Sequence, residues 1–121
     1  MFRILSTMLA CLVLAALAAP GPTRASGPAA RAAAACTPPK YPGSGYFTSV
    51  AVRGVSCATG RRVVLAHYRC RTRSGRAGRC RRSVLRYRCS ETRRSIATEI
   101  NGRVNCRRGG RRVTYTYQQN T

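Results

Sequence analysis

Residues 96–117 read IATEINGRVNCRRGGRRVTYTY, and this stretch decides the fold. From 96 to 106, apolar or small residues occupy almost every even position, and polar or charged residues stand between them. A period of two predicts one long strand with a buried side and a solvent-facing side. The basic segment 107–112 contains a Gly-Gly pair that can adopt positive φ, which predicts a tight hairpin turn. The alternating residues at 113–117 then form the last strand.

Two upstream segments also have strand character. Residues 85–89 alternate apolar side chains with arginines, and the polar run 91–94 predicts the turn that follows them. Residues 46–53 are rich in aromatic and β-branched side chains, which favour a strand, and Gly54 ends this stretch.

A helix is expected between these strand segments. Ser56 is a good N-cap for a helix from Cys57 to about Arg71, in which apolar residues recur at intervals of three and four. Gly60 costs a helix about 1 kcal/mol relative to Ala, so its presence indicates a close contact between helix and sheet. The sequence therefore predicts an α+β fold, with one helix packed on an antiparallel sheet of about four strands. The expected order is strand, helix, strand, strand, strand.

The N-terminus has the character of a secretory signal. Residues 4–19 are apolar and uncharged, a length that suits a signal peptide better than a membrane-spanning helix. Small residues around Ala25 predict cleavage by signal peptidase after residue 25. The Ala-Leu-Ala segment at 16–18 is a second candidate cleavage site. A membrane anchor is the alternative. We therefore predict a secreted protein with a signal peptide at 1–25, a flexible Ala/Pro/Gly-rich arm at 26–44 and a single domain at 45–121.

The cysteines predict a disulfide framework. Removal of the signal peptide takes Cys11 away and changes the count from seven to six. An even number of cysteines in a small exported chain is typical of structural disulfides, and the absence of close Cys pairs disfavours zinc. The six are Cys36, Cys57, Cys70, Cys80, Cys89 and Cys106. Sequence spacing alone leaves 15 pairings open, among which we expect a bridge between Cys70 and Cys80 that closes a basic loop.

The charge is the strongest functional signal. The chain has 23 Lys plus Arg and 2 Asp plus Glu, for a net charge of +21. The loss of Arg3 and Arg24 with the signal peptide would leave 21 basic residues against 2 acids, or +19. A GC-rich genome accounts for much of the excess of Arg over Lys, but it does not account for the scarcity of acids.

Such a surface predicts binding to polyanions: nucleic acid, envelope polymers or an anionic lipid surface. The candidate anion-binding residues are the clustered arginines Arg61, Arg62, Arg69, Arg71, Arg73, Arg76, Arg79, Arg81, Arg82, Arg107, Arg108, Arg111 and Arg112. No motif for sequence-specific nucleic-acid reading accompanies them. A solvated loop without function is the alternative interpretation of the 71–79 segment.

The residues for enzyme chemistry are few, and we predict a non-enzymatic protein without cofactor or metal. The chain has no Asp, which excludes a Ser-His-Asp triad. The least favoured alternative is a small ribonuclease that uses His67 and Glu99 as acid and base. A further alternative is a protein-binding or inhibitor-like domain, whose partner face would be an edge at 115–117 and the C-terminal residues 118–120.

Two short motifs resemble those of small exported Arg-rich proteins of high-GC Gram-positive bacteria. They are Val-Ser-Cys-Ala-Thr at 55–59, followed by Val63-Val64 and Tyr68, and Val-x-Cys-Arg-Arg-Gly at 104–109. The resemblance extends from about residue 45 to the C-terminus. It implies no activity and no ligand, and it favours a structural role for Cys57 and Cys106 in joining the helix start to the sheet.

Overall fold

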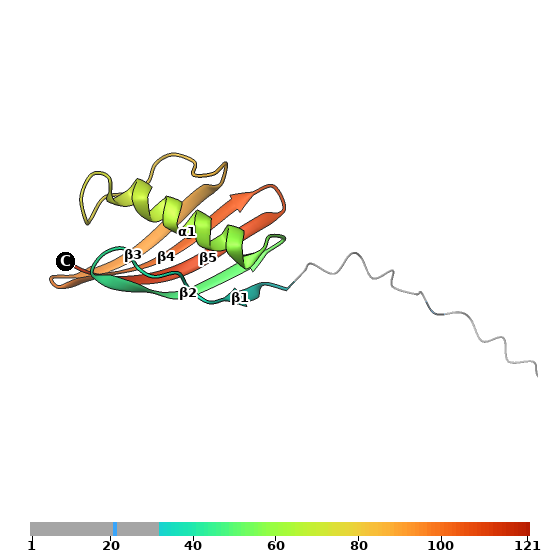
Figure 1. Ribbon diagram of the computed structural model, residues 1–121, viewed down its shortest axis with the longest axis horizontal. Coiled ribbons are helices and arrows are strands. Elements are labelled where there is room, and N and C mark those ends of the chain that lie inside the picture. The colour runs from blue at the N-terminus through green and yellow to red at the C-terminus, as the bar shows by residue number, and fades with distance from the viewer. Residues whose placement is uncertain (1–20, 22–31) are drawn as a thin grey trace, which may run out of the picture.

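Five antiparallel strands form one sheet in the order β1-β2-β5-β4-β3, and one helix lies across it (Figure 1). This computed structural model describes Gly21 and residues 32–121, so most of the predicted signal peptide and residues 26–31 lie outside the described residues. The elements are β1 (Ala34–Cys36), β2 (Gly45–Arg53), α1 (Cys57–Thr72), β3 (Arg88–Ile96), β4 (Glu99–Arg108) and β5 (Arg111–Asn120). The predicted α+β class and the single helix are confirmed.

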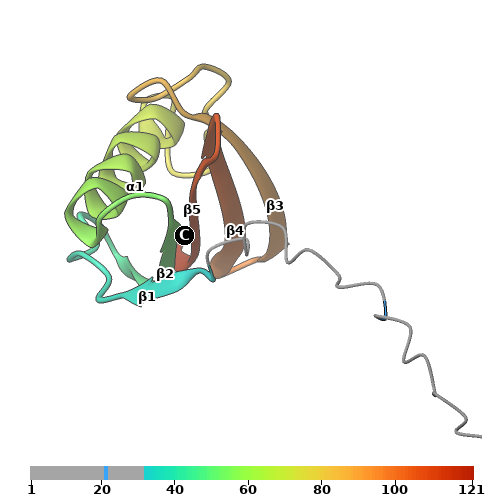
Figure 2. The ribbon, with the colours of Figure 1, turned by 90° about the vertical axis from the view of Figure 1, so that its right-hand side faces the viewer.

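The sheet has an inner face, which packs against α1, and an outer face on the opposite side. Viewed at right angles to Figure 1, the sheet is curved and α1 lies on its concave side (Figure 2). The last strand is central, because β5 pairs with both β2 and β4. The core between helix and sheet contains Phe47, Val50, Val52, Val63, Val64, Ile100, Val104, Val113, Tyr115 and Tyr117.

The predicted number of four strands is too low by one. The additional strand, β1, lies inside the segment that was predicted to be a flexible arm, and it pairs with β2. Besides this pairing, a disulfide and the packing of an aromatic ring hold the segment to the domain. Cys36 forms a disulfide with Cys57 at the start of α1, and the Tyr41 ring packs against Phe47 with centroids 4.8 Å apart. The prolines between them exclude regular structure there, but they do not prevent tethering.

The helix follows the sequence prediction closely. The Ser56 side chain accepts a hydrogen bond from the Thr59 amide at 3.1 Å, which caps the first turn. The expected close approach at Gly60 is confirmed, since a Cβ atom there would lie 2.4 Å from Cγ1 of Val52. A side chain at this position would push the helix away from the sheet.

The predicted turn at residues 91–94 is wrong. These residues lie within β3, and the hairpin turns instead at residues 97–98. As a result, Ile96 ends β3 with 65% of its surface exposed, and β4 begins at Glu99. The polar run is compatible with a strand because Glu91 and Arg93 point to the inner face and form an ion pair there at 2.9 Å.

The expected strand at 85–89 is also shifted. Leu85 and Arg86 both have positive φ and form a two-residue turn, which Val84 and Tyr87 close by backbone hydrogen bonds. Leu85 is therefore half exposed, at 53%, while Tyr87 is buried. β3 starts only at Arg88.

Three disulfides involve all six predicted cysteines. Cys70–Cys80 is the expected pair, and Cys36–Cys57 and Cys89–Cys106 are the other two. Cys57 joins the helix start to β1, while Cys106 is bound to its cross-strand neighbour on β3 and not to the helix. Each bridge typically stabilises a small domain by about 2–4 kcal/mol. The framework fits an extracellular location, where disulfides persist.

We expect Gly102→Ala to lower the free energy of unfolding by about 1–3 kcal/mol, the usual cost of overpacking a core. Gly102 lies on the inner face of β4, where an added Cβ would stand 2.2 Å from Cε1 of the Tyr117 ring. Gly110→Ala is the matched control, because Gly110 lies in a turn with nothing within 4 Å of the added atom. Urea denaturation of both variants tests this, and equal stabilities would contradict it.

Candidate anion-binding surface

The loop between α1 and β3 is held in place by a disulfide and by hydrogen bonds from side chains of the sheet to its backbone. The Cys70–Cys80 disulfide closes its base, ten residues apart in sequence. At its far side, the Arg93 guanidinium on β3 donates to the Ala77 carbonyl at 2.8 Å and to the Gly78 carbonyl. The chain turns between these points through Gly75, whose φ is +116°. The loop is therefore a fixed part of the fold.

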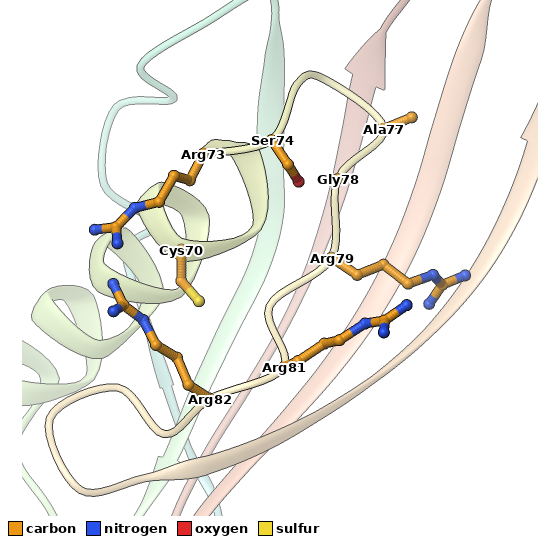
Figure 3. Close-up of a pocket in the computed structure, with 8 residues that line it drawn as sticks. All are labelled: Cys70, Arg73, Ser74, Ala77, Gly78, Arg79, Arg81 and Arg82. Atoms are coloured by element: carbon orange, nitrogen blue, oxygen red, sulfur yellow. The ribbon is translucent and has the colours of Figure 1, made fainter.

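This loop borders an open, basic hollow of about 680 Å³ (Figure 3). Its lining consists of Cys70, Arg73, Ser74, Ala77, Gly78, Arg79, Arg81 and Arg82. The four arginines are exposed and no lining residue is acidic. In Figure 3, Arg73 and Arg82 extend to one side beside Cys70, and Arg79 and Arg81 extend to the other side, over the sheet. We call these four residues the loop arginines.

The loop arginines form two pairs that extend to opposite sides, so together they can contact neighbouring anionic groups of one polyanion. A guanidinium offers parallel N–H donors that match the oxygens of phosphate or carboxylate. A loop fixed at both ends loses little conformational entropy when its side chains engage a ligand. The hollow therefore provides several guanidinium groups on a firm backbone.

Most of the predicted arginines lie at the surface, but in separate places. Arg62, Arg69, Arg73, Arg76, Arg79, Arg81, Arg82, Arg107 and Arg111 are exposed, and Arg61, Arg108 and Arg112 are partly exposed. Arg71 is the exception. The structure places it in the interior with 0% of its surface exposed, so it is not a surface anion-binding residue.

Arg71 occupies a polar site between α1 and β5. Its Nη1 donates to Oε1 of Gln119 at 2.8 Å, and its Nη2 donates to the Tyr41 hydroxyl at 2.6 Å. The guanidinium carbon lies 3.9 Å from the centre of the Tyr117 ring, a cation–π contact. These contacts engage both terminal nitrogens of the guanidinium, while its buried Nε has no hydrogen-bond partner among the described residues, and they tie the helix end to the last strand.

Glu91 lies beside this site on β3 and holds the one ion pair of the described chain. Its carboxylate accepts from Arg93 and from the Tyr117 hydroxyl, and both charged side chains are only 7% exposed. Burial pushes the pKa of the Glu91 carboxyl upward, but the hydrogen bonds from Arg93 and Tyr117 outweigh burial and hold the pKa below its usual value. The carboxylate is therefore charged inside the protein.

His67 and Glu99 do not form the acid–base pair that a ribonuclease would need. His67 lies on the inner side of α1, is 1% exposed and hydrogen-bonds through Nδ1 to the Tyr115 hydroxyl at 2.6 Å. Glu99 begins β4 and contacts Asn101 and Gln118, whose side chains lie on the outer face. The sheet separates the two groups.

The expected protein-binding edge at 115–117 is not formed either. Tyr115 and Tyr117 are each 1% exposed, and β5 is flanked by strands on both sides. Their rings face the helix and belong to the core. The alternation that identified this strand left open whether its aromatic side faces the core or a partner.

Two arginines that sequence reasoning missed, Arg53 and Arg88, belong to the outer face of the sheet. Arg53 pairs in register with Arg112, and Arg88 pairs with Arg107. The signal in the sequence is only that each arginine stands next to an inward-facing residue of its strand, Val52 for Arg53 and Cys89 for Arg88. Strand register, which the sequence did not fix, brings them together.

Comparisons with protein-family models, with curated proteins and with solved structures gave no match. The resemblance noted from the two short motifs stays a prediction. Within residues 32–121, no helix is long and apolar enough to cross a membrane. The same residues contain no cluster of three or more His, Cys, Asp or Glu side chains that could hold a metal ion.

Proposed function

We propose that this protein is secreted and acts without catalysis, by binding polyanions at the cell envelope through its arginine-rich surface. The observation that carries the proposal is the basic hollow of the disulfide-closed loop, which four exposed arginines and no acid line. Glu91 is buried in its own ion pair, so it does not neutralise these arginines. The hollow therefore attracts anionic groups with little competition from the protein itself.

The test removes the four loop arginines together, as Arg73→Gln, Arg79→Gln, Arg81→Gln and Arg82→Gln, and measures binding to purified poly(glycerol phosphate). We expect at least a tenfold loss of affinity at low salt. The plot of log affinity against log salt should also become shallower by about 3, because each contact to a single anionic chain contributes about 0.7 to its slope.

The matched control removes the same charge from four scattered exposed basic residues outside the loop, Lys40, Arg62, Arg86 and Arg111, each replaced by Gln. This control should lose clearly less affinity than the loop variant. Equal losses would show that net charge alone governs binding. Binding of the unaltered protein that does not weaken with salt would overturn the proposal as a whole.

A further inference from the structure

Four arginines form a continuous row across the outer face of the sheet. The register pairs Arg53 of β2 with Arg112 of β5, Arg112 with Arg107 of β4, and Arg107 with Arg88 of β3. We call these four the cross-strand row. Each arginine is next to an inward-facing residue of its strand, namely Val52, Val113, Cys106 and Cys89. Because side chains alternate along a strand, all four arginines project outward from the outer face.

The row is electrostatically unfavourable as it stands. Like charges directly opposite each other on neighbouring strands repel, and this row contains three such pairs. Of the two acids, Glu91 points to the inner face in its own ion pair, and Glu99 lies at the opposite end of β4. In addition, Nε of Arg53 is buried without a hydrogen-bond partner among the described residues. The row therefore has unused donors and an excess of positive charge.

The composition of the rest of the outer face indicates which ligands could bind there. The next row along the strands is small and uncharged and consists of Ser90, Asn105, Thr114 and Ala51, and beyond it stand the exposed Arg103 and Arg94. Among the described residues, the one aromatic side chain on this face is Tyr46, which lies at the far end of β2 from Arg53. Nucleic-acid bases need aromatic platforms for stacking. A polymer bound to this face would therefore be held through the polymer's own anionic backbone, and not through stacked bases.

We propose that the cross-strand row is a track for a single linear phosphodiester chain that runs across the strands, with one phosphate at each guanidinium. Strands lie about 4.8 Å apart, so the four Cα positions span about 14 Å. The outer face is the convex side of the curved sheet (Figure 2), on which the side chains can fan outward to match wider phosphate spacing. The inference rests on the proposed polyanion binding but uses a surface separate from the loop hollow.

A nucleic-acid strand and a wall polymer share this phosphodiester chemistry, so the experiment uses both. The row variant carries Arg53→Gln, Arg88→Gln, Arg107→Gln and Arg112→Gln. Its binding to poly(glycerol phosphate) and to oligo-dT with the same number of phosphates is compared with that of the loop variant and the scattered control. A polyglutamate of equal charge serves as a carboxylate competitor.

We expect the row variant to lose at least tenfold in affinity for both phosphodiester probes, and more than the scattered control. Its salt slope should fall by about 3, four contacts at about 0.7 each. Affinity should also rise steeply as the probe lengthens from two to four phosphates. If the row variant loses affinity for only one of the two probes, the track is supported and its ligand is of that probe's class, a nucleic-acid strand or a wall polymer.

The inference is overturned if the row variant binds as well as the scattered control, or if polyglutamate displaces the phosphodiesters at equal charge. If the unaltered protein binds and only the loop variant is weakened, the inference fails while the proposed function stands. If the unaltered protein binds neither probe, both fail. Thermal unfolding at low salt checks the fold, because removal of like charges should leave the row variant at least as stable as the unaltered protein.

Discussion

Glu91→Gln is expected to lower the free energy of unfolding by about 3–5 kcal/mol, the usual cost of removing one partner of a buried ion pair. In the native protein, the interior beside α1 holds Arg71 and Arg93 against Glu91, a net charge of +1. The variant would raise this charge to +2. The amide keeps the size and shape of the side chain, so the loss reports charge and not a cavity.

The second acid of the chain is the matched control. Glu99 stands at the start of β4, where its carboxylate meets only the amides of Asn101 and Gln118. Glu99→Gln removes the same charge without leaving a buried cation, and we expect a change below about 1 kcal/mol. Urea denaturation at neutral pH measures both variants. Equal effects would show that the interior cations do not depend on Glu91.

A double variant tests whether excess positive charge in the interior causes the loss of stability in Glu91→Gln. Arg71→Met in the Glu91→Gln background returns the interior charge to +1. It also leaves no partner of Arg71 stranded, because the Tyr41 hydroxyl still donates to Oε1 of Gln119 at 2.7 Å. We therefore expect the double variant to be more stable than Glu91→Gln alone. A further loss would mean that the packing and cation–π contacts of Arg71 outweigh its charge.

The same residues explain where sequence reasoning succeeded. The helix and the β4–β5 hairpin carry strong local signals: a Ser cap, a 3–4 apolar spacing, and alternation on both sides of a Gly-Gly turn. The helix bounds are correct to within one residue. The hairpin is correctly located, but its turn is only 109–110, and β5 runs from Arg111 to Asn120 rather than over 113–117. The Cys70–Cys80 pair follows because the two residues flank one loop.

β3 was misplaced because its inner face is polar. Glu91 and Arg93 stand where alternation calls for apolar residues, and their mutual neutralisation is a tertiary effect that no local pattern shows. β1 was missed for a related reason. A three-residue strand with small side chains carries no signal of its own, and it is fixed by the Cys36–Cys57 bridge.

The candidate sites likewise differ in whether a local sequence pattern or the tertiary structure determines them. The loop arginines were predicted from composition, because an exposed basic loop can be recognised locally. The interior position of Arg71 follows from three contacts on distant segments, namely Tyr41, Tyr117 and Gln119. The cross-strand row depends on register across four strands, which single-strand alternation leaves open.

The free energy of unfolding of the domain should also fall in mild acid, because of His67. The imidazole is buried, and desolvation lowers its pKa from 6.5 to about 4. Glu91 opposes this shift, while Arg71 and Arg93 add to it. As the pH falls below 6.5, the unfolded chain binds a proton at this residue and the folded protein does not. Between pH 7 and 4.5 the free energy of unfolding should drop by about 2 kcal/mol from this group.

The contributions of His67 and Glu91 to the pH dependence of stability fall in different pH ranges. The pKa of Glu91 lies below its usual value of 4.5, so its contribution is lost only as the pH falls further. His67→Gln, whose amide can still accept from the Tyr115 hydroxyl, should flatten the profile between pH 7 and 4.5. Because His67 is the single histidine of the chain, its NMR titration is unambiguous. An imidazole that titrates near 6.5 in the folded protein would contradict the prediction, and a persistent slope in His67→Gln would assign the acid sensitivity to another group.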